Sequence, residues 1–182
     1  PYSVCSDFIT KDTELIPASR LMKIKKQLNH ESTYRHFVSC CKEAGLDAVP
    51  FLDRMLTVDF IIANEDRHFN NFGVLRNPET LEITDFAPIY DSGTSLCHNR
   101  NKNQFNHYDS KPFYTDFNRQ VALVTSFEWF NEGDAICIFK DIEDVLMDSV
   151  DKGLITGERI EQLKQFVFMK YKHICDLKTK HL

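Results

Sequence analysis

The chain has 182 residues, of which 42% are hydrophobic, and its formal net charge is −5. This length and apolar content suit one compact unit with its own core, to which fifteen Phe and six Tyr contribute large apolar area. The acidic balance argues against broad phosphate contacts, and no apolar run approaches the roughly 18 residues of a membrane span, so we expect no direct nucleic-acid binding and no membrane partner.

The cysteines and the N-terminus indicate where the protein works. Six cysteines are present without a C-x-x-C pair, and the adjacent Cys40 and Cys41 are a poor basis for a disulfide framework. We therefore expect free thiols, a reducing compartment and a cytoplasmic protein. The chain opens with "PYSVCSDFIT", an apolar alternation without Met, and this opening indicates a fragment of a larger protein.

Two helices are predicted in the first third of the chain. Residues 31–44 place their apolar side chains on one face, and Gly45 ends the run. Asp47 can cap the next helix, and Pro50 is tolerated in its first turn. This second helix continues to about residue 62 and is apolar on most sides, so we expect it at the centre of the fold.

Strands follow the second helix. Residues 72–76 and 81–84 flank "NPET", four residues with Asn-Pro turn chemistry, which predicts a short hairpin. Residues 98–120 are polar and aromatic without a clean period, and so long a loop is usually functional or mobile. Helical patterns return at 138–150 and 157–179. The sequence thus predicts a mainly α protein with one hairpin.

The stretch "NEDRHFNNFG", residues 64–73, places polar side chains directly behind the apolar run "VDFIIA". An EF-hand calcium loop that starts at Asp66 does not fit, because such a loop needs Gly at its sixth position and Glu at its twelfth. Here these positions are Asn71 and Asn77. A zinc site fails as well, because His68 has no partner four residues later and His98 stands alone.

A magnesium site for phosphoryl transfer fits this stretch better. Kinase catalytic loops place a base Asp five residues before a metal-binding Asn, and a second metal Asp arrives later in an Asp-x-Gly. Asp66 and Asn71 have that offset, and Asp91 precedes Ser92 and Gly93. The predicted hairpin can bring residue 91 back beside residue 71. The pentad alone decides little, because Asn and Asp runs also cap helices and solvate turns.

In this pattern the sequence resembles the HipA-like kinases, the bacterial toxin kinases of type II toxin–antitoxin systems. Their hallmark is N-x-D-R-H-x-x-N, followed after a hairpin by a proline and a Tyr-Asp pair. The chain carries it in order, as Asn64, Asp66, Arg67, His68 and Asn71, then Pro88, Tyr90 and Asp91. The resemblance implies a kinase-like helical C-lobe over residues 1–182, with the hinge at about 1–10, the catalytic and metal segment at about 60–96, and the metal site carried by the hairpin.

The resemblance also implies roles for individual residues. Asp66 would be the catalytic base, and Asn71 and Asp91 would hold Mg²⁺ against the phosphates of ATP. The nucleotide itself would be contacted by His68, Tyr90 and the hinge residues Ser6, Asp7 and Phe8. The implied activity is ATP- and magnesium-dependent phosphorylation of a Ser/Thr hydroxyl on a protein substrate, although the residues alone would equally allow a lipid or small-molecule hydroxyl.

One departure from the family pattern leaves an alternative open. No glycine-rich loop and no phosphate-binding lysine precede the hinge in this sequence. We therefore expect the fragment alone to be inactive even if its parent is a kinase. The alternative function is a non-catalytic or degenerate lobe that acts as an interaction module for an antitoxin-like protein or a DNA-associated complex.

The stretch 98–120 is locally basic within an acidic chain. Its four basic side chains are Arg100, Lys102, Lys111 and Arg119. Loops on a rigid scaffold often carry recognition, so one interpretation is a loop that contacts a substrate or partner. The other interpretation is a surface loop held in place by a few aromatic side chains.

Overall fold

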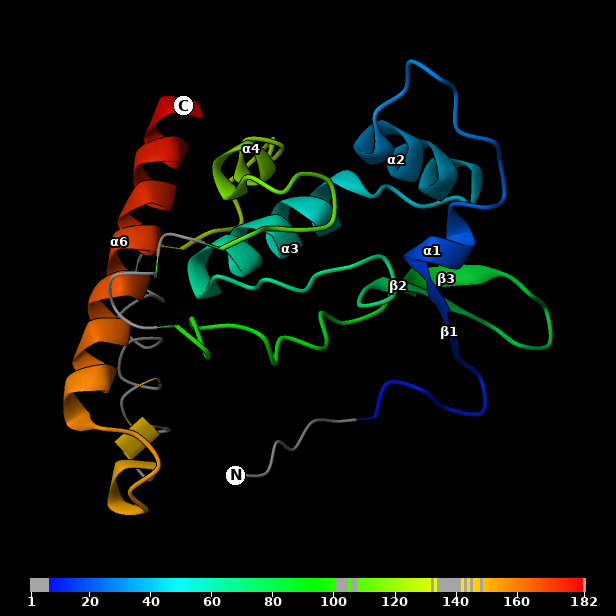
Figure 1. Ribbon diagram of the computed structural model, residues 1–182. Coiled ribbons are helices and arrows are strands. Elements are labelled where there is room, and N and C mark those ends of the chain that lie inside the picture. Colours follow the sequence, from blue (N-terminus) through cyan, green and yellow to red (C-terminus); the bar gives the residue numbers. More distant parts are fainter. Residues whose placement is uncertain are drawn as a thin grey trace.

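The computed structural model describes residues 7–100, 105, 108–131, 133, 142, 144, 146–147 and 149–181, and Figure 1 shows their arrangement. A small sheet lies at one end, and a long C-terminal helix runs along the opposite side. Among the described helices, none has the apolar stretch that crossing a bilayer requires. Ser6 and much of the predicted helix at 138–150 lie outside the described residues.

The sheet has three antiparallel strands in the order β1-β2-β3, namely β1 (Glu14–Pro17), β2 (Gly73–Arg76) and β3 (Ile83–Phe86). The predicted hairpin is confirmed, with its second strand two residues later than expected because Leu81 adopts a positive φ of 62° and belongs to the turn. Strand β1 was not predicted. It pairs with β2 where a Cβ on Gly73 would lie 2.2 Å from the carbonyl oxygen of Ile16, so only glycine allows this close approach.

The described helices are α1 (Ala18–Leu21), α2 (Thr33–Glu43), α3 (Val49–Ile62), α4 (Phe117–Val121) and α6 (Gly157–His181). The predictions at 31–44 and 157–179 are confirmed. Ser32 caps α2 by accepting the backbone N–H of Arg35 at 3.3 Å. The N-cap of α3 is Ala48 rather than the expected Asp47, which lies one residue earlier and whose carboxylate accepts the N–H of Val49 at 3.1 Å.

Helix α3 lies at the centre of the fold, as predicted. Leu52, Met55 and Leu56 are at most 1% exposed. Asp53 is also buried, and its carboxylate accepts the backbone N–H groups of Thr125 and Ser126 at 2.9 and 3.0 Å. These hydrogen bonds hold residues 125 and 126, which follow α4, against the central helix.

Helix α6 packs against α3 and covers part of the 98–120 stretch (Figure 1). The buried ammonium group of Lys170 lies over four aromatic rings at 3.7 to 5.5 Å from their centroids. These rings belong to Phe60, Tyr108, Phe117 and Phe166. The lysine thus joins α6 to α3, to α4 and to the segment before α4.

The part of the 98–120 stretch that the structure describes is held by aromatic and polar contacts within the molecule. Tyr108 is buried and stacks on Phe117 of α4 at 4.8 Å. The basic side chains are already engaged within the molecule: Arg100 pairs with Glu65, Lys111 pairs with Asp66, and Arg119 lies over the ring of Tyr114. Lys102 lies outside the described residues.

Candidate active site

The polar stretch begins where α3 ends. Ala63 adopts the left-handed conformation with φ of 51°, which stops the helix and turns the chain. Asn64 then donates its backbone N–H to the carbonyl of Asp59 at 2.9 Å, and its side-chain nitrogen donates to the Asp59 carboxylate at 2.9 Å. The first residue of the stretch is therefore buried, at 1% exposure, and faces the core.

Arg67 also turns inward, and it forms a buried ion pair with Asp59. Its Nε and Nη2 atoms donate to the two carboxylate oxygens of Asp59 at 2.8 and 2.9 Å, in the two-pronged geometry that arginine favours. Arg67 is fully buried and Asp59 is 4% exposed. Residues 64–73 are polar partly because Asn64 and Arg67 supply hydrogen bonds to the buried carboxylate of Asp59 in α3.

The same guanidinium joins two segments that are distant in sequence. Its Nη1 atom donates to the carbonyl of Asn71 at 2.7 Å and also to the carbonyl of Tyr90, while Nη2 donates to Ser92 Oγ at 3.1 Å. The residues before β2 and after β3 thus lie within hydrogen-bonding distance of one side chain. The contact joins the backbone of Asn71 to that of Tyr90, the residue before Asp91; Asn71 and Asp91 are the two predicted magnesium ligands.

Residues 66–71 form a compact loop around one carbonyl group. The backbone oxygen of Asp66 accepts the N–H of His68 at 2.8 Å and the side-chain nitrogen of Asn71 at 2.9 Å. The side chains of Asp66 and His68 point outward, with 39% and 43% exposure, and the Nδ1 atom of His68 accepts the N–H of Asn70. The loop therefore presents a carboxylate and an imidazole to solvent.

The carboxylate of Asp66 has a cationic partner from the 98–120 stretch. Lys111 Nζ lies 2.7 Å from Asp66 Oδ1, and His68 Nε2 lies 3.9 Å from Asp66 Oδ2. The hydrogen bond from Lys111 holds the pKa of Asp66 below its ordinary value, assisted by the charges of Lys111 and His68, although partial burial acts in the opposite direction. Asp66 is thus ionised at neutral pH, as a proton acceptor must be.

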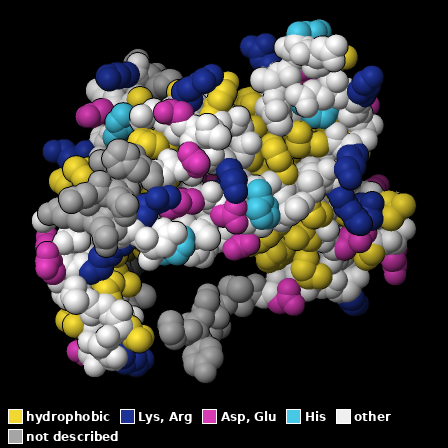
Figure 2. Space-filling model, viewed as in Figure 1, with side chains coloured by type: hydrophobic (Ala, Val, Ile, Leu, Met, Phe, Trp, Pro, Cys, Tyr) yellow, Lys and Arg dark blue, Asp and Glu magenta, His cyan; other side chains and the backbone are white. Residues whose placement is uncertain are grey.

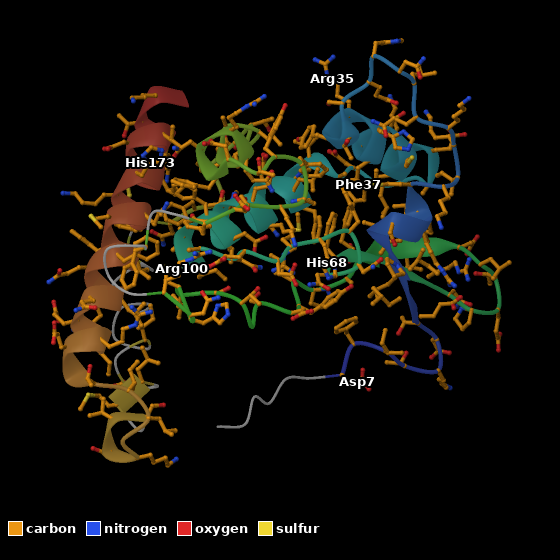
Figure 3. The ribbon with its side chains drawn as sticks, viewed as in Figure 1. Asp7, Arg35, Phe37, His68, Arg100 and His173 are labelled. Atoms are coloured by element: carbon orange, nitrogen blue, oxygen red, sulfur yellow. The ribbon has the colours of Figure 1, made fainter. Side chains whose placement is uncertain are left out.

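Tyr90 and the N-terminal segment border the loop on another side. The Tyr90 hydroxyl donates to the carbonyl of Asn70 at 2.8 Å, and its ring lies 5.7 Å from that of Phe8. Burial raises the pKa of Tyr90, with Arg67 acting in the opposite direction, so the phenol keeps the proton that it donates. Asp7 caps its own turn by accepting the N–H of Ile9 at 2.8 Å. In Figure 3 Asp7 lies below His68 on this segment.

The exposed side of the site is a mixed-charge surface. Figure 2 shows acidic, basic and histidine side chains side by side near the centre of the face. Within the described part of the chain, no group of three or more His, Cys, Asp or Glu side chains could hold a metal by itself. A magnesium ion here would have to share its shell with phosphates and water, as it commonly does.

The structure brings together Asp66, His68, Asn71, Tyr90 and Asp91, with Phe8 against Tyr90. Asp59 was not predicted from the sequence, and Arg67 had no predicted role. Lys111 was predicted only as one of four basic residues of the 98–120 stretch, and not as the partner of Asp66. An aspartate inside the apolar run "VDFIIA" is a usable signal, because a buried carboxylate requires a partner nearby. Lys111 lies 45 residues beyond Asp66 and leaves no local signal.

Comparisons with known proteins place the fold. No protein-family model matches the chain, and no curated protein matches it in sequence. The crystal structure of a proinflammatory kinase from Helicobacter pylori, CtkA, aligns with 96% of this chain and 74% of that chain, with a TM-score of 0.61 and 14% sequence identity. This likeness shows a kinase-like fold, helix-rich with a three-stranded antiparallel sheet.

Proposed function

We propose that this chain is a phosphotransferase lobe that transfers the γ-phosphate of ATP, with Mg²⁺, to a Ser or Thr hydroxyl of a protein substrate. The observation that carries the proposal is the Arg67 guanidinium, which holds the Asn71 and Tyr90 carbonyls on one nitrogen atom. This contact supports the proposal, because it joins the loop that carries Asp66 and Asn71 to the residue before Asp91.

Asp66 supplies the proton acceptor in this proposal. The acceptor hydroxyl gives its proton to the Asp66 carboxylate while its oxygen bonds to the γ-phosphorus. The bond from the γ-phosphorus to the bridging oxygen breaks, and ADP leaves. The ionised and half-exposed carboxylate suits this role, because a base must be charged and must reach the substrate.

Asn71 and Asp91 are the residues that would hold magnesium. The Asn71 side-chain nitrogen is used by the Asp66 carbonyl, which leaves the amide oxygen as its acceptor end. Asp91 is exposed and stands in a left-handed conformation with φ of 53° just beyond the Tyr90 carbonyl. One carboxylate and one amide oxygen fit an ion that keeps several positions for phosphates and water. When bound, magnesium would neutralise charge on the nucleotide phosphates.

Tyr90 and Phe8 would border the nucleotide. Their rings are 5.7 Å apart and partly exposed, and they adjoin the loop that carries Asp66. Such a surface suits a flat base, and His68 and Asp7 add polar groups beside it. Ser6, the remaining hinge candidate, stays a prediction from the sequence.

Asp66→Asn tests the proposed function. In the full-length gene product, transfer of labelled phosphate from Mg·ATP to itself and to a generic protein acceptor should fall about 10²-fold or more, because the base is lost. Asp151→Asn, an exposed carboxylate outside the site, makes the same charge change and should leave the rate unchanged.

The test also separates the alternative function. An unchanged rate in Asp66→Asn would show that Asp66 is not the base. Nucleotide binding without any transfer would favour a non-catalytic lobe that engages an antitoxin-like protein. A wild-type protein that neither binds Mg·ATP nor transfers phosphate would end the kinase proposal.

A further inference from the structure

Lys111 reaches the candidate base from a distant part of the chain. Its Nζ atom lies 2.7 Å from Asp66 Oδ1, and the two side chains are 47% and 39% exposed. Both groups are therefore accessible to a substrate that approaches from solvent. An exposed ion pair of this kind contributes little to stability, typically about 0–1 kcal/mol, so folding alone gives little reason for the contact.

The backbone that carries Lys111 is held by a buried side chain. Gln120 is 3% exposed, its nitrogen donates to the Lys111 carbonyl, and its oxygen accepts the N–H groups of Phe113 and Tyr114. Ser110 donates its N–H to the Thr115 carbonyl at 2.7 Å and closes the same turn. The turn 110–115 is thus a defined platform.

An aromatic anchor fixes this platform to the rest of the fold. The ring of Phe113 packs edge-on against Tyr34 at 5.2 Å and against Phe69 at 5.8 Å. Phe69 belongs to the same loop as Asp66. The platform therefore presents Lys111 to Asp66 from a fixed position, which lowers the cost of ordering a long side chain during reaction.

The arginines near this loop are paired with carboxylates other than Asp66. Arg67 is fully buried against Asp59. Arg100 pairs with Glu65, with its Nε atom 3.0 Å from the carboxylate. Among the Lys and Arg side chains that the structure describes, Lys111 is the one in contact with Asp66.

We infer that Lys111 is a catalytic residue that binds the transferred phosphoryl group while it remains in contact with Asp66. This inference rests on the proposed function. An ammonium group beside the base lies next to the acceptor hydroxyl and can reach the non-bridging oxygens of the γ-phosphate. Those oxygens carry charge in the transition state, where a fixed cation is most effective. Lys111 stays protonated, and the hydroxyl proton goes to Asp66.

The experiment compares Lys111→Met and Lys111→Arg in the full-length gene product, with Lys26→Met as a control. Lys26 is exposed and distant from the site in sequence, and its loss makes the same charge change. Lys111→Met should lower kcat about 10²- to 10³-fold while KM for ATP changes only a few-fold. Lys111→Arg should recover part of kcat, and the melting temperature of Lys111→Met should match that of Lys26→Met.

Binding measurements need no turnover and separate the two proposals. Calorimetry should show that wild type and Lys111→Met bind Mg·ADP equally, and that aluminium fluoride, which mimics the transferred phosphoryl group, tightens binding in wild type alone. If wild type transfers phosphate and Lys111→Met does so equally well, the role of Lys111 is refuted and the proposed function stands. If the wild type shows no transfer, the binding data decide: equal tightening by aluminium fluoride in wild type and Lys111→Met would refute the role of Lys111. If wild type binds no nucleotide at all, both proposals fall.

Discussion

At the scale of single residues, Arg67 and Asp59 form the buried pair on which the site depends. We expect Arg67→Met to lower the free energy of unfolding by about 3–5 kcal/mol, because the variant leaves the buried Asp59 charge without its partner. Arg67→Lys keeps the charge but loses the two-pronged contact and should also destabilise the protein. Urea unfolding of the purified variants measures both effects.

A half-exposed ion pair provides the matched control. Arg76 pairs with Glu14 at 2.7 Å, with 32% and 39% exposure, so Arg76→Met should cost less than about 1 kcal/mol. Adding Asp59→Asn to Arg67→Met removes the unpaired charge and should restore part of the lost stability. If Arg67→Met and Arg76→Met proved equally stable, the buried pair would stabilise the protein no more than the half-exposed one.

At the scale of elements, the close approach of β1 and β2 depends on Gly73. A Cβ at this position would lie 2.2 Å from the Ile16 carbonyl oxygen and 2.9 Å from Pro17 Cα, both backbone atoms that cannot rotate away. Gly73→Ala should therefore cost about 1–3 kcal/mol, as overpacking does. A methyl group on Gly93 would meet no atom within 4 Å, so Gly93→Ala should change stability by at most about 0.5 kcal/mol. Equal losses of stability in Gly73→Ala and Gly93→Ala, measured by thermal unfolding, would show that the close approach of β1 and β2 does not require glycine at position 73.

Elements with a clear periodicity were predicted from the sequence. The helices at 31–44 and 157–179 and the hairpin beyond α3 follow local patterns, and the structure confirms them. Strand β1 escaped prediction because "ELIP" is four residues long, ends in proline and depends on pairing with a strand almost sixty residues later.

The candidate site residues were named from a local motif and from a predicted hairpin that returns residue 91 toward residue 71. Asp66 and Asn71 share one loop, and their offset suggested the chemistry together with the hairpin and Asp91 beyond it. Asp59 inside an apolar run signals that a partner lies nearby but does not identify Arg67, whereas Lys111 arrives from 45 residues away and has no local pattern. Their roles required the tertiary structure.

At the scale of the whole molecule, Lys170 ties α6 to the rest of the fold. Burial lowers its pKa to about 8 from an ordinary 10.5, and the nearby Cys97 acts in the opposite direction. Between these two values the unfolded chain holds more protons on Lys170 than the folded one, so a rise in pH increases the free energy of unfolding. The gain is at most about 3 kcal/mol. Attraction of the ammonium to the ring faces, about 0.5–2 kcal/mol, reduces it.

Comparison with Lys170→Met isolates this contribution. The variant lacks the titrating group, so wild type should gain stability relative to it as the pH rises from 7.5 to 10. Burial raises the pKa of Cys97, to about 11, and that of Tyr108, and both residues are present in both proteins. Most of their effect therefore cancels, and the coupling between Cys97 and Lys170 remains in the difference. Urea unfolding across this range checks the prediction, and a constant difference would disprove it.

The platform of Lys111 has a consequence for how the protein is made. A ribosome synthesises the chain from its N-terminus, and α3 with the loop at 66–71 emerges well before Gln120, which fixes the turn 110–115. Tyr108, just ahead of that turn, stacks on Phe117 of α4 and gains its contact with Lys170 when α6 has followed. A nascent chain can therefore fold its central helix while the contact between Lys111 and Asp66 is still unmade. Phosphate transfer, if it depends on that contact, begins only when synthesis of this region is nearly complete.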